Sequence, residues 1–258
     1  MRHVIIHKPM SQAALWSVRL ASFGAVVAGL AALLAHFRAI DPLAGLVVLA
    51  GAGLFALAAV LLAAAAAVDV WQTGCQGTAM ALAGLALSLL VLAYPTTFAV
   101  QAVRLPVLSD VTTDIADPPE FALSAKALAA RGGKTPAEVS AATRQAQQRA
   151  YPGVQPKLVD AEGSEALQLV LKVIALRGWQ VVEQTAPGGR SGLGHIDAVD
   201  RTRIMGFPDD IAIRLRPLPG QTRVDVRSVS RYGLHDFGTN ARRIEAFMTE
   251  LQAQADAR

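Results

Sequence analysis

Three long apolar segments in the first 103 residues place the strongest constraint on how this chain folds. They cover about residues 20–37, 43–68 and 78–100, and each is close to or longer than the stretch of about 20 apolar residues that a helix needs to cross a bilayer core. Pro95 lies in the last turns of the third segment, where a freed carbonyl is easily satisfied near the interface. We therefore predict three transmembrane helices and assign residues 1–103 to a membrane anchor.

The composition of the chain changes sharply after this anchor. Residues 1–103 hold four of the 24 Lys and Arg residues and two of the 20 acidic residues, and all the others lie in residues 104–258. The formal net charge of +4 divides evenly between the two parts, and no basic run interleaved with aromatic residues is present. We therefore expect a water-soluble second part and no nucleic-acid partner.

The basic residues that flank the apolar segments predict the orientation. Arg2 and Lys8 precede the first segment, Arg19 lies at its start, and the next loop carries only Arg38. Short cytoplasmic loops carry an excess of Lys and Arg, so we expect a cytoplasmic N-terminus. Three crossings then place the C-terminal domain on the periplasmic side of the cytoplasmic membrane, although Arg104 opposes the bias.

Two alternatives concern the anchor itself. A basic leader followed by an apolar stretch is also typical of a cleaved signal peptide, but two further segments follow, so the chain stays anchored in either case. Cys75 is the one cysteine, which rules out an internal disulfide framework; palmitoylation is the alternative to a small residue near a helix end. The cores of the spans carry no acidic residue, which argues against an ion or proton path.

The patterning of the second part predicts a soluble α+β domain at 135–258 that follows an extended connector at 104–134. Pro118 and Pro119 forbid a helix around them, and Gly132-Gly133 ends the connector. The order of the expected elements predicts a roughly four-stranded antiparallel sheet packed against helices. We expect helices over residues 135–150, 161–177 and 239–254, and strands over residues 179–185, 193–204, 210–216 and 222–231.

The last two predicted strands each have one apolar and one charged face. Residues 190–243 contain ten arginines and no lysine, and arginine is preferred where a carboxylate or phosphate is bound in a planar, bidentate way. The pattern is first of all that of a solvated face with cross-strand ion pairs, such as Arg214 or Arg216 with Asp225, each contributing under about 1 kcal/mol. The functional hypothesis beside it is an anion-binding face that recognises an anionic lipid or an acidic protein partner. The arginines that share the charged face are Arg214, Arg216, Arg223, Arg227 and Arg231.

The opposite, inward face carries two hydroxyl groups that need partners. Ser228 and Ser230 fall on this face, and a buried hydroxyl is normally hydrogen-bonded. We predict a structural polar lock, made of these serines with Asp236, Asn240 and Arg243, that holds the last helix on the sheet. A ligand site built from the same groups is the alternative.

An enzyme is the alternative function. A hydrolase-like site would use Asp209 or Asp210 with His195 or His235, but spacing alone cannot position a triad. His195 and Asp197 share a strand face, yet two side chains make a poor metal site. No glycine-rich phosphate loop follows a predicted strand. We therefore assign no catalytic residue, metal ligand or cofactor.

Six stretches of the second part stand out by their residues: Asp114-Ile-Ala-Asp-Pro-Pro119, Ala150-Tyr-Pro-Gly153, Gly178-Trp179, Phe207-Pro-Asp-Asp-Ile-Ala-Ile-Arg214, Arg223-Val-Asp-Val-Arg-Ser-Val-Ser-Arg231 and Asp236-Phe-Gly-Thr-Asn-Ala-Arg-Arg-Ile244. They resemble landmarks of a bacterial and plastid family known as domain of unknown function 1499 (DUF1499). The resemblance covers roughly residues 105–253 and implies one coherent domain in an envelope setting, with N-terminal membrane spans; it implies no activity, cofactor or catalytic residue. Pro208 departs from the family pattern, in which we expect a lysine or similar residue, and it makes that strand start stiffer. Combined with the charge pattern, this predicts a membrane-tethered binding or scaffold module.

Overall fold

A computed structural model describes residues 9–188 and 192–257 of the chain. The chain forms two compact units that divide between Val100 and Gln101, with the short segment Arg203–Gly206 grouped with the first unit. Three residues that entered the charge arguments above lie outside the described ranges: Arg2, Lys8 and Arg190.

The first unit consists of long apolar helices, as predicted. Each of the three is long and apolar enough to cross a membrane. The first helix starts earlier than the predicted residue 20, because the Ser11 hydroxyl accepts a hydrogen bond from the Ala14 amide and caps it. Gly24 allows close packing of the first two helices, since a Cβ at this position would lie 3.1 Å from the Ala52 carbonyl oxygen. The helices are α1 (Gln12–His36), α2 (Pro42–Thr73) and α3 (Thr78–Arg104).

The second unit is built on a six-stranded antiparallel sheet, two strands more than predicted. The strand order is β1-β6-β5-β4-β3, and β2 pairs with the other part of the same edge of β6. The two missed strands have three residues each, which is too short for an alternating pattern to be recognised. The strands are β1 (Asp110–Thr112), β2 (Lys157–Val159), β3 (Gln180–Thr185), β4 (Gly194–Arg201), β5 (Pro208–Leu218) and β6 (Gln221–Ser230).

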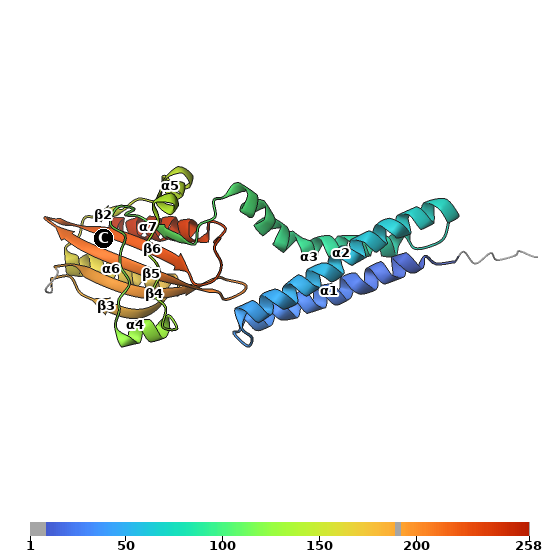
Figure 1. Ribbon diagram of the computed structural model, residues 1–258, viewed down its shortest axis with the longest axis horizontal. Helices are drawn as coiled ribbons and strands as arrows, with labels where there is room; N and C mark the ends of the chain where they lie inside the picture. Colours follow the sequence, from blue (N-terminus) through green and yellow to red (C-terminus); the bar gives the residue numbers. More distant parts are fainter. Residues whose placement is uncertain (1–8, 189–191, 258) are drawn as a thin grey trace, which may run out of the picture. The chain divides into compact units, whose positions relative to one another are not determined.

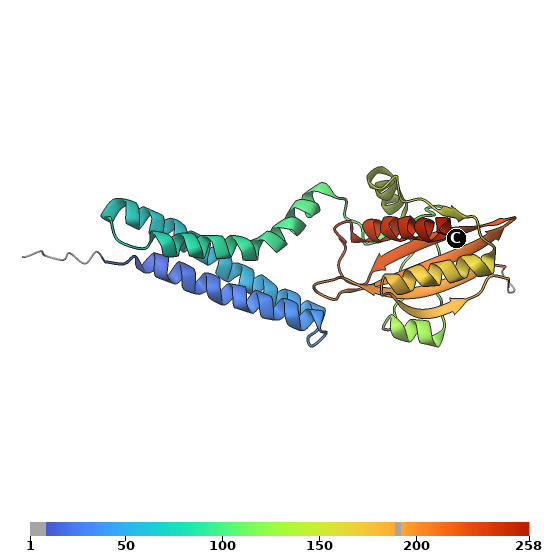
Figure 2. The ribbon, with the colours of Figure 1, turned by 180° about the vertical axis from the view of Figure 1, so that it is seen from behind.

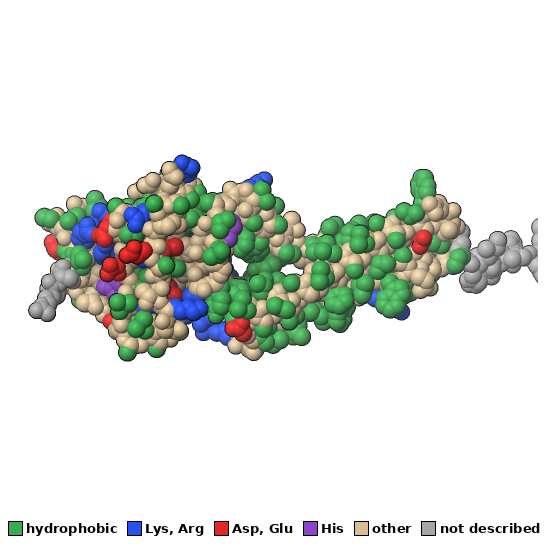
Figure 3. Space-filling view, viewed as in Figure 1, with side chains coloured by type: hydrophobic (Ala, Val, Ile, Leu, Met, Phe, Trp, Pro, Cys, Tyr) green, Lys and Arg blue, Asp and Glu red, His purple; other side chains and the backbone are tan. Residues whose placement is uncertain are grey.

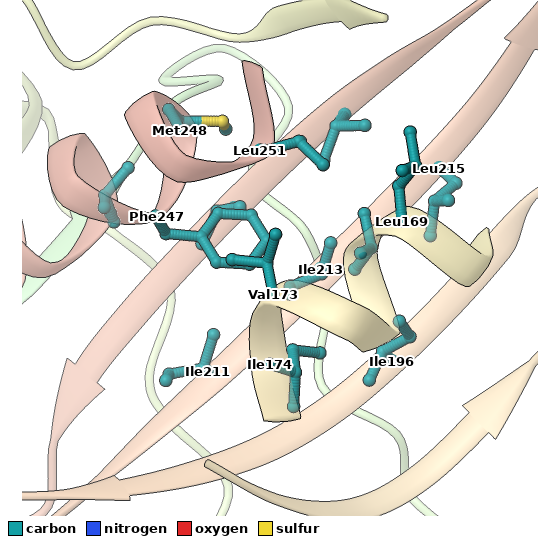
Figure 4. Packing of buried hydrophobic residues seen from close by; sticks show 14 of the residues in the cluster. Leu169, Val173, Ile174, Ile196, Ile211, Ile213, Leu215, Phe247, Met248 and Leu251 are labelled. Atoms are coloured by element: carbon teal, nitrogen blue, oxygen red, sulfur yellow. The ribbon is translucent and has the colours of Figure 1, made fainter. Parts of the chain in front are cut away.

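Two amphipathic helices, α6 (Gly163–Leu176) and α7 (Thr239–Asp256), cover one face of the sheet (Figure 2). Their apolar stripes meet the inward side chains of β4, β5 and β6 to form the main core, shown in Figure 4. Phe247 lies at the centre of this core, fully buried, and its ring stacks on Trp179 with centroids 5.2 Å apart. The predicted positions of both helices are correct, because each has the hydrophobic period of a helix over a long stretch.

The opposite face of the sheet is also covered, which the sequence did not predict. Residues 113–150, here called the covering segment, cross this face in Figure 1 and include helices α4 (Ala125–Ala130) and α5 (Ala141–Ala150). Ala127 of α4 packs with Val182 and Val199 in a second, smaller core. The Gln147 side chain forms hydrogen bonds with both the amide and the carbonyl of Thr112. The connector predicted at 104–134 is therefore largely part of the folded domain.

The start of α5 also differs from the prediction. We predicted a helix over residues 135–150, whereas α5 begins at Ala141. The Ser140 hydroxyl accepts a hydrogen bond from the Thr143 amide at 3.1 Å and caps the helix instead.

Candidate functional site

The predicted arginine face exists, but the covering segment occupies it. Arg214 is the centre of this arrangement, and its side chain is largely buried. Its guanidinium donates to the carboxylate of Asp225 on the neighbouring strand at 3.2 Å, and to Asp117 and Asp114 of the covering segment at 2.8 and 3.3 Å. Asp225 has no exposed side-chain surface and also accepts from Arg223 at 3.0 Å. Buried charges of this kind are tolerated only when they are paired, so removal of one member would leave the others uncompensated.

The other predicted arginines are paired in the same way. Arg227 is buried and binds Asp110 at 2.6 Å and the Ala137 carbonyl at 2.9 Å, which ties β6 to β1 and to the covering segment. Arg231 forms a bidentate pair with Asp210, at 2.7 and 2.9 Å. In Figure 3, acidic and basic side chains lie next to each other on this side of the domain. Most of the face is therefore neutralised by the chain itself.

One end of the arginine face stays accessible, at the turn between β5 and β6. Arg216 and Arg223 are 36% and 28% exposed there, and Asp117 is 67% exposed. Asp117 accepts from Arg216 at 3.3 Å, and Arg223 donates to Asp114 at 2.7 Å. We call Asp117, Arg216 and Arg223 the rim. It is the part of the predicted anion-binding face that can meet a ligand without unfolding the covering segment.

A second buried ion pair joins the covering segment to β4. Arg131 donates to Asp197 at 2.8 Å, and both side chains are buried. The other oxygen of Asp197 lies 2.9 Å from Nε2 of His195, which is partly exposed. The Arg131 guanidinium also donates to the Ala122 carbonyl. His195 and Asp197 do meet on one strand face, but Asp197 is committed to holding the segment, and the described residues form no metal-binding group of three or more His, Cys, Asp or Glu.

The structure brings the predicted polar lock together at the start of α7. The Ser228 hydroxyl donates to Oδ1 of Asn240 at 2.8 Å, and Nδ2 of Asn240 donates to the Ser230 hydroxyl at 3.0 Å. Arg243 donates to the Ser228 hydroxyl at 3.0 Å and to Oδ1 of Asn240 at 2.6 Å. Asp236 accepts from the Asn240 amide at 2.8 Å and so caps the helix. These groups satisfy one another, as a structural role requires.

Two aspartates complete the lock and were not predicted as part of it. Arg243 is buried and its guanidinium binds both Asp200, at 2.6 Å, and the more deeply buried Asp209. Burial raises the pKa of Asp209, against the opposing effect of the Arg243 charge, and the neighbouring Asp200 raises it further. Burial lowers the pKa of Arg243, but the charges of Asp209 and Asp200 together outweigh this effect and raise the pKa, so the guanidinium stays charged.

The groups of the hydrolase-like alternative do not converge. Asp209 faces α7 and binds Arg243, whereas Asp210 faces the other way and binds Arg231. His195 binds Asp197, and Nδ1 of His235 accepts from the Phe237 amide at 3.0 Å. Within the described ranges, no hydrogen bond joins either histidine to either aspartate of the proposed pair.

Comparison with known families assigns this domain. A family model described as protein of unknown function (DUF1499) matches residues 110–251, more than half of the chain. The chain belongs to the DUF1499 family. The match begins at the first residue of β1 and ends within α7, so the DUF1499 domain includes the covering segment and excludes the three apolar helices. No curated protein matches the chain.

The acidic partners of the arginine face were the main functional residues that sequence reasoning missed. Asp110, Asp114 and Asp117 lie in a short acidic stretch that ends in two prolines. They are about one hundred residues from the arginines that they bind, so no local pattern relates them. The one available signal was the density of carboxylates in this stretch.

Proposed function

We propose that the protein is a membrane-tethered binding module whose DUF1499 domain lies on the outer face of the cytoplasmic membrane and takes an acidic segment of a partner protein at the rim. The observation that supports this is the partial exposure of the Arg216 and Arg223 guanidinium groups beside the exposed carboxylate of Asp117, which Arg216 shares with the buried Arg214. A carboxylate of a partner would replace that of Asp117 on Arg216 with the same geometry.

The arrangement of the rim favours replacement of the Asp117 carboxylate by one from a partner over replacement of any other carboxylate on the arginine face. Asp117 is part of an irregular stretch next to Pro118, and its side chain is exposed, so its ion pairs are the weakest of the set. Asp225 and Asp114 remain on Arg214 and Arg223 when Asp117 leaves. The native occupant of the rim is a carboxylate on an extended chain, which favours an acidic peptide segment over a lipid headgroup.

The binding test uses the full chain in nanodiscs of zwitterionic lipid, with a fluorescent oligoglutamate peptide as the probe. We expect saturable binding that weakens as salt screens the charges. Asp117→Asn removes the competing carboxylate and should tighten binding by about two- to fivefold, the range expected for an exposed ion pair. A protein with Arg216→Gln and Arg223→Gln should bind more weakly than wild type. Fluorescence anisotropy measures all three affinities.

A matched control separates the rim from general basicity. Lys172→Gln and Arg242→Gln remove two exposed positive charges from α6 and α7, on the opposite face of the sheet, and should leave the peptide affinity unchanged. Equal affinities for wild type, Asp117→Asn and the double rim variant would refute the proposal. Rim-dependent binding to nanodiscs that contain anionic lipid, without peptide binding, would assign the rim to headgroups and also overturn it.

The orientation predicts a second result. Alkaline phosphatase fused after Arg258 should be active in bacteria, because its disulfides form only outside the cytoplasm. The fusion point follows the chain end because α7 continues to Asp256, and a fusion within it would remove packed residues. An inactive phosphatase together with a fluorescent cytoplasmic reporter at the same site would place the domain inside the cell.

A further inference from the structure

Exposed apolar side chains gather at the end of the sheet opposite the rim. Leu234 and Tyr232, in the loop between β6 and α7, are 81% and 40% exposed. Val107, just before β1, is 66% exposed. The two segments are neighbours, because the Asp236 amide donates to the Leu108 carbonyl at 2.8 Å and β1 pairs with the end of β6. Large apolar side chains grouped in this way mark an interaction surface.

The loop presents these side chains in a preformed conformation. Gly233 and Gly238 have positive φ angles of 81° and 73°, which reverse the chain twice. The Asp236 carboxylate is buried and accepts hydrogen bonds from the amides of Gly238 and Asn240 at 2.9 and 2.8 Å. Leu234 is therefore held outward by the backbone, and little entropy is lost when it meets a partner.

The length of the chain limits what this surface can reach. Helix α3 ends at Arg104, and Leu108 is already buried in the domain, so only residues 105–107 link the two. Four steps of about 3.5 Å give at most about 14 Å of extended chain. The helical turn from Val100, where we place the end of the span, adds about 6 Å. Leu108, which accepts a hydrogen bond from the Asp236 amide of the loop, can therefore be at most about 20 Å along the chain from the end of the span.

The chemistry of this surface matches a bilayer interface. Tyrosine is enriched at the level of the lipid headgroups, where its ring is half in apolar surroundings and its hydroxyl is in water. Arg104 and Arg242 are exposed nearby and attract anionic headgroups. Residues 231–235 contain no acid, and the Asp236 carboxylate is turned inward to cap α7. A charged tip would oppose insertion, whereas residues 232–234 at this tip carry no charge.

We propose that the β6–α7 loop, residues 231–238, inserts Leu234 and Tyr232 into the headgroup region of the membrane that holds the apolar helices. Insertion orients the strands away from the bilayer. The rim lies about seven strand residues further along β6, roughly 23 Å from the inserted loop at 3.3 Å per residue. The rim is then held beyond the headgroups, within reach of a protein partner. The insertion itself does not depend on what the rim binds.

The test measures the depth of single labelled sites in the full chain. Cys75→Ser removes the one native cysteine, and Leu234→Cys then carries an environment-sensitive fluorophore, with the protein in nanodiscs. The matched control is Pro219→Cys, an exposed site in the β5–β6 turn at the other end of the sheet. We expect lipids spin-labelled near the headgroup to quench the label at 234 several-fold more strongly than the label at 219. Aqueous iodide should show the opposite order.

Two results would overturn the insertion, and a third measurement tells which side chain anchors the loop. Equal quenching of both labels by lipid would mean that the domain lies flat on the membrane or has no fixed orientation. Full access of iodide to the label at 234 would mean that the loop stays in water. Unchanged depth after Tyr232→Ser in the labelled protein supports Leu234 as the main anchor, whereas loss of lipid quenching in that variant supports the pair.

Discussion

Replacing Arg243 with glutamine is expected to lower the free energy of unfolding by about 3–5 kcal/mol at neutral pH, because removal of one partner leaves a buried charge unpaired. Asp209 then has no positive neighbour in a site from which water is excluded, and Ser228 and Asn240 each lose a hydrogen bond. Chemical denaturation of the full chain in mild detergent measures the change. Trp179 fluorescence reports it once Trp16 and Trp71 are replaced by phenylalanine.

The control for Arg243→Gln is the same substitution at the adjacent residue. Arg242→Gln removes an exposed guanidinium that donates to the Phe237 carbonyl at 2.9 Å, and it should cost well under about 1 kcal/mol. Equal losses for the two variants would mean that the buried network carries no special stability. Such a result would remove the structural assignment of the polar lock.

Arg243→Gln should also change how the free energy of unfolding depends on pH. Burial raises the pKa of Asp209 in the folded protein above its unfolded value, so the folded state binds the proton more tightly. A raised pKa of this kind gives stability that is present below the unfolded pKa and is lost as pH rises through the folded pKa. Loss of the Arg243 charge raises the folded pKa further. The destabilisation by Arg243→Gln should therefore shrink as pH falls toward the unfolded pKa of Asp209.

The long periodic elements were predictable because their patterns are local. Helix α7 and the hairpin of β5 and β6 repeat apolar residues over ten or more positions, which is enough to identify both the type of element and its buried face. The same parity predicted that five arginines share one face and that Ser228 faces inward toward Asn240. The structure has both arrangements.

The covering of the arginine face was not predictable in the same way. A face of alternating arginines looks solvated when only the neighbouring strands are considered. The carboxylates that neutralise it come from an irregular, proline-containing stretch, which has no hydrophobic period to indicate that it folds onto the sheet. Asp209 and Asp210 also could not be assigned their partners from the local pattern. Each pairs with an arginine that only the tertiary structure brings near.

Replacing Arg214 with glutamine is the second change with a large expected effect, and it reverses what the sequence alone suggested. A solvated face would tolerate the change, whereas in the structure Arg214 is largely buried among three carboxylates. Arg223 still binds Asp225 and Asp114 in this variant, which reduces the expected loss of stability. We expect a loss of about 2–4 kcal/mol, somewhat less than for a buried charge left with no partner at all.

The matched variant is Arg216→Gln, two residues further along the same strand and on the same face. Arg216 has one long ion pair with an exposed aspartate, so its loss should cost under about 1 kcal/mol. Chemical denaturation of both variants measures the two losses in the free energy of unfolding. Hydrogen exchange of the amides in β1 and α4 shows which part of the domain opens. Arg214→Gln should raise exchange there, since the covering segment loses its main attachment to β5. If both variants unfold like wild type, the covering segment is held by its apolar contacts at Phe121 and Ala127 rather than by the arginines.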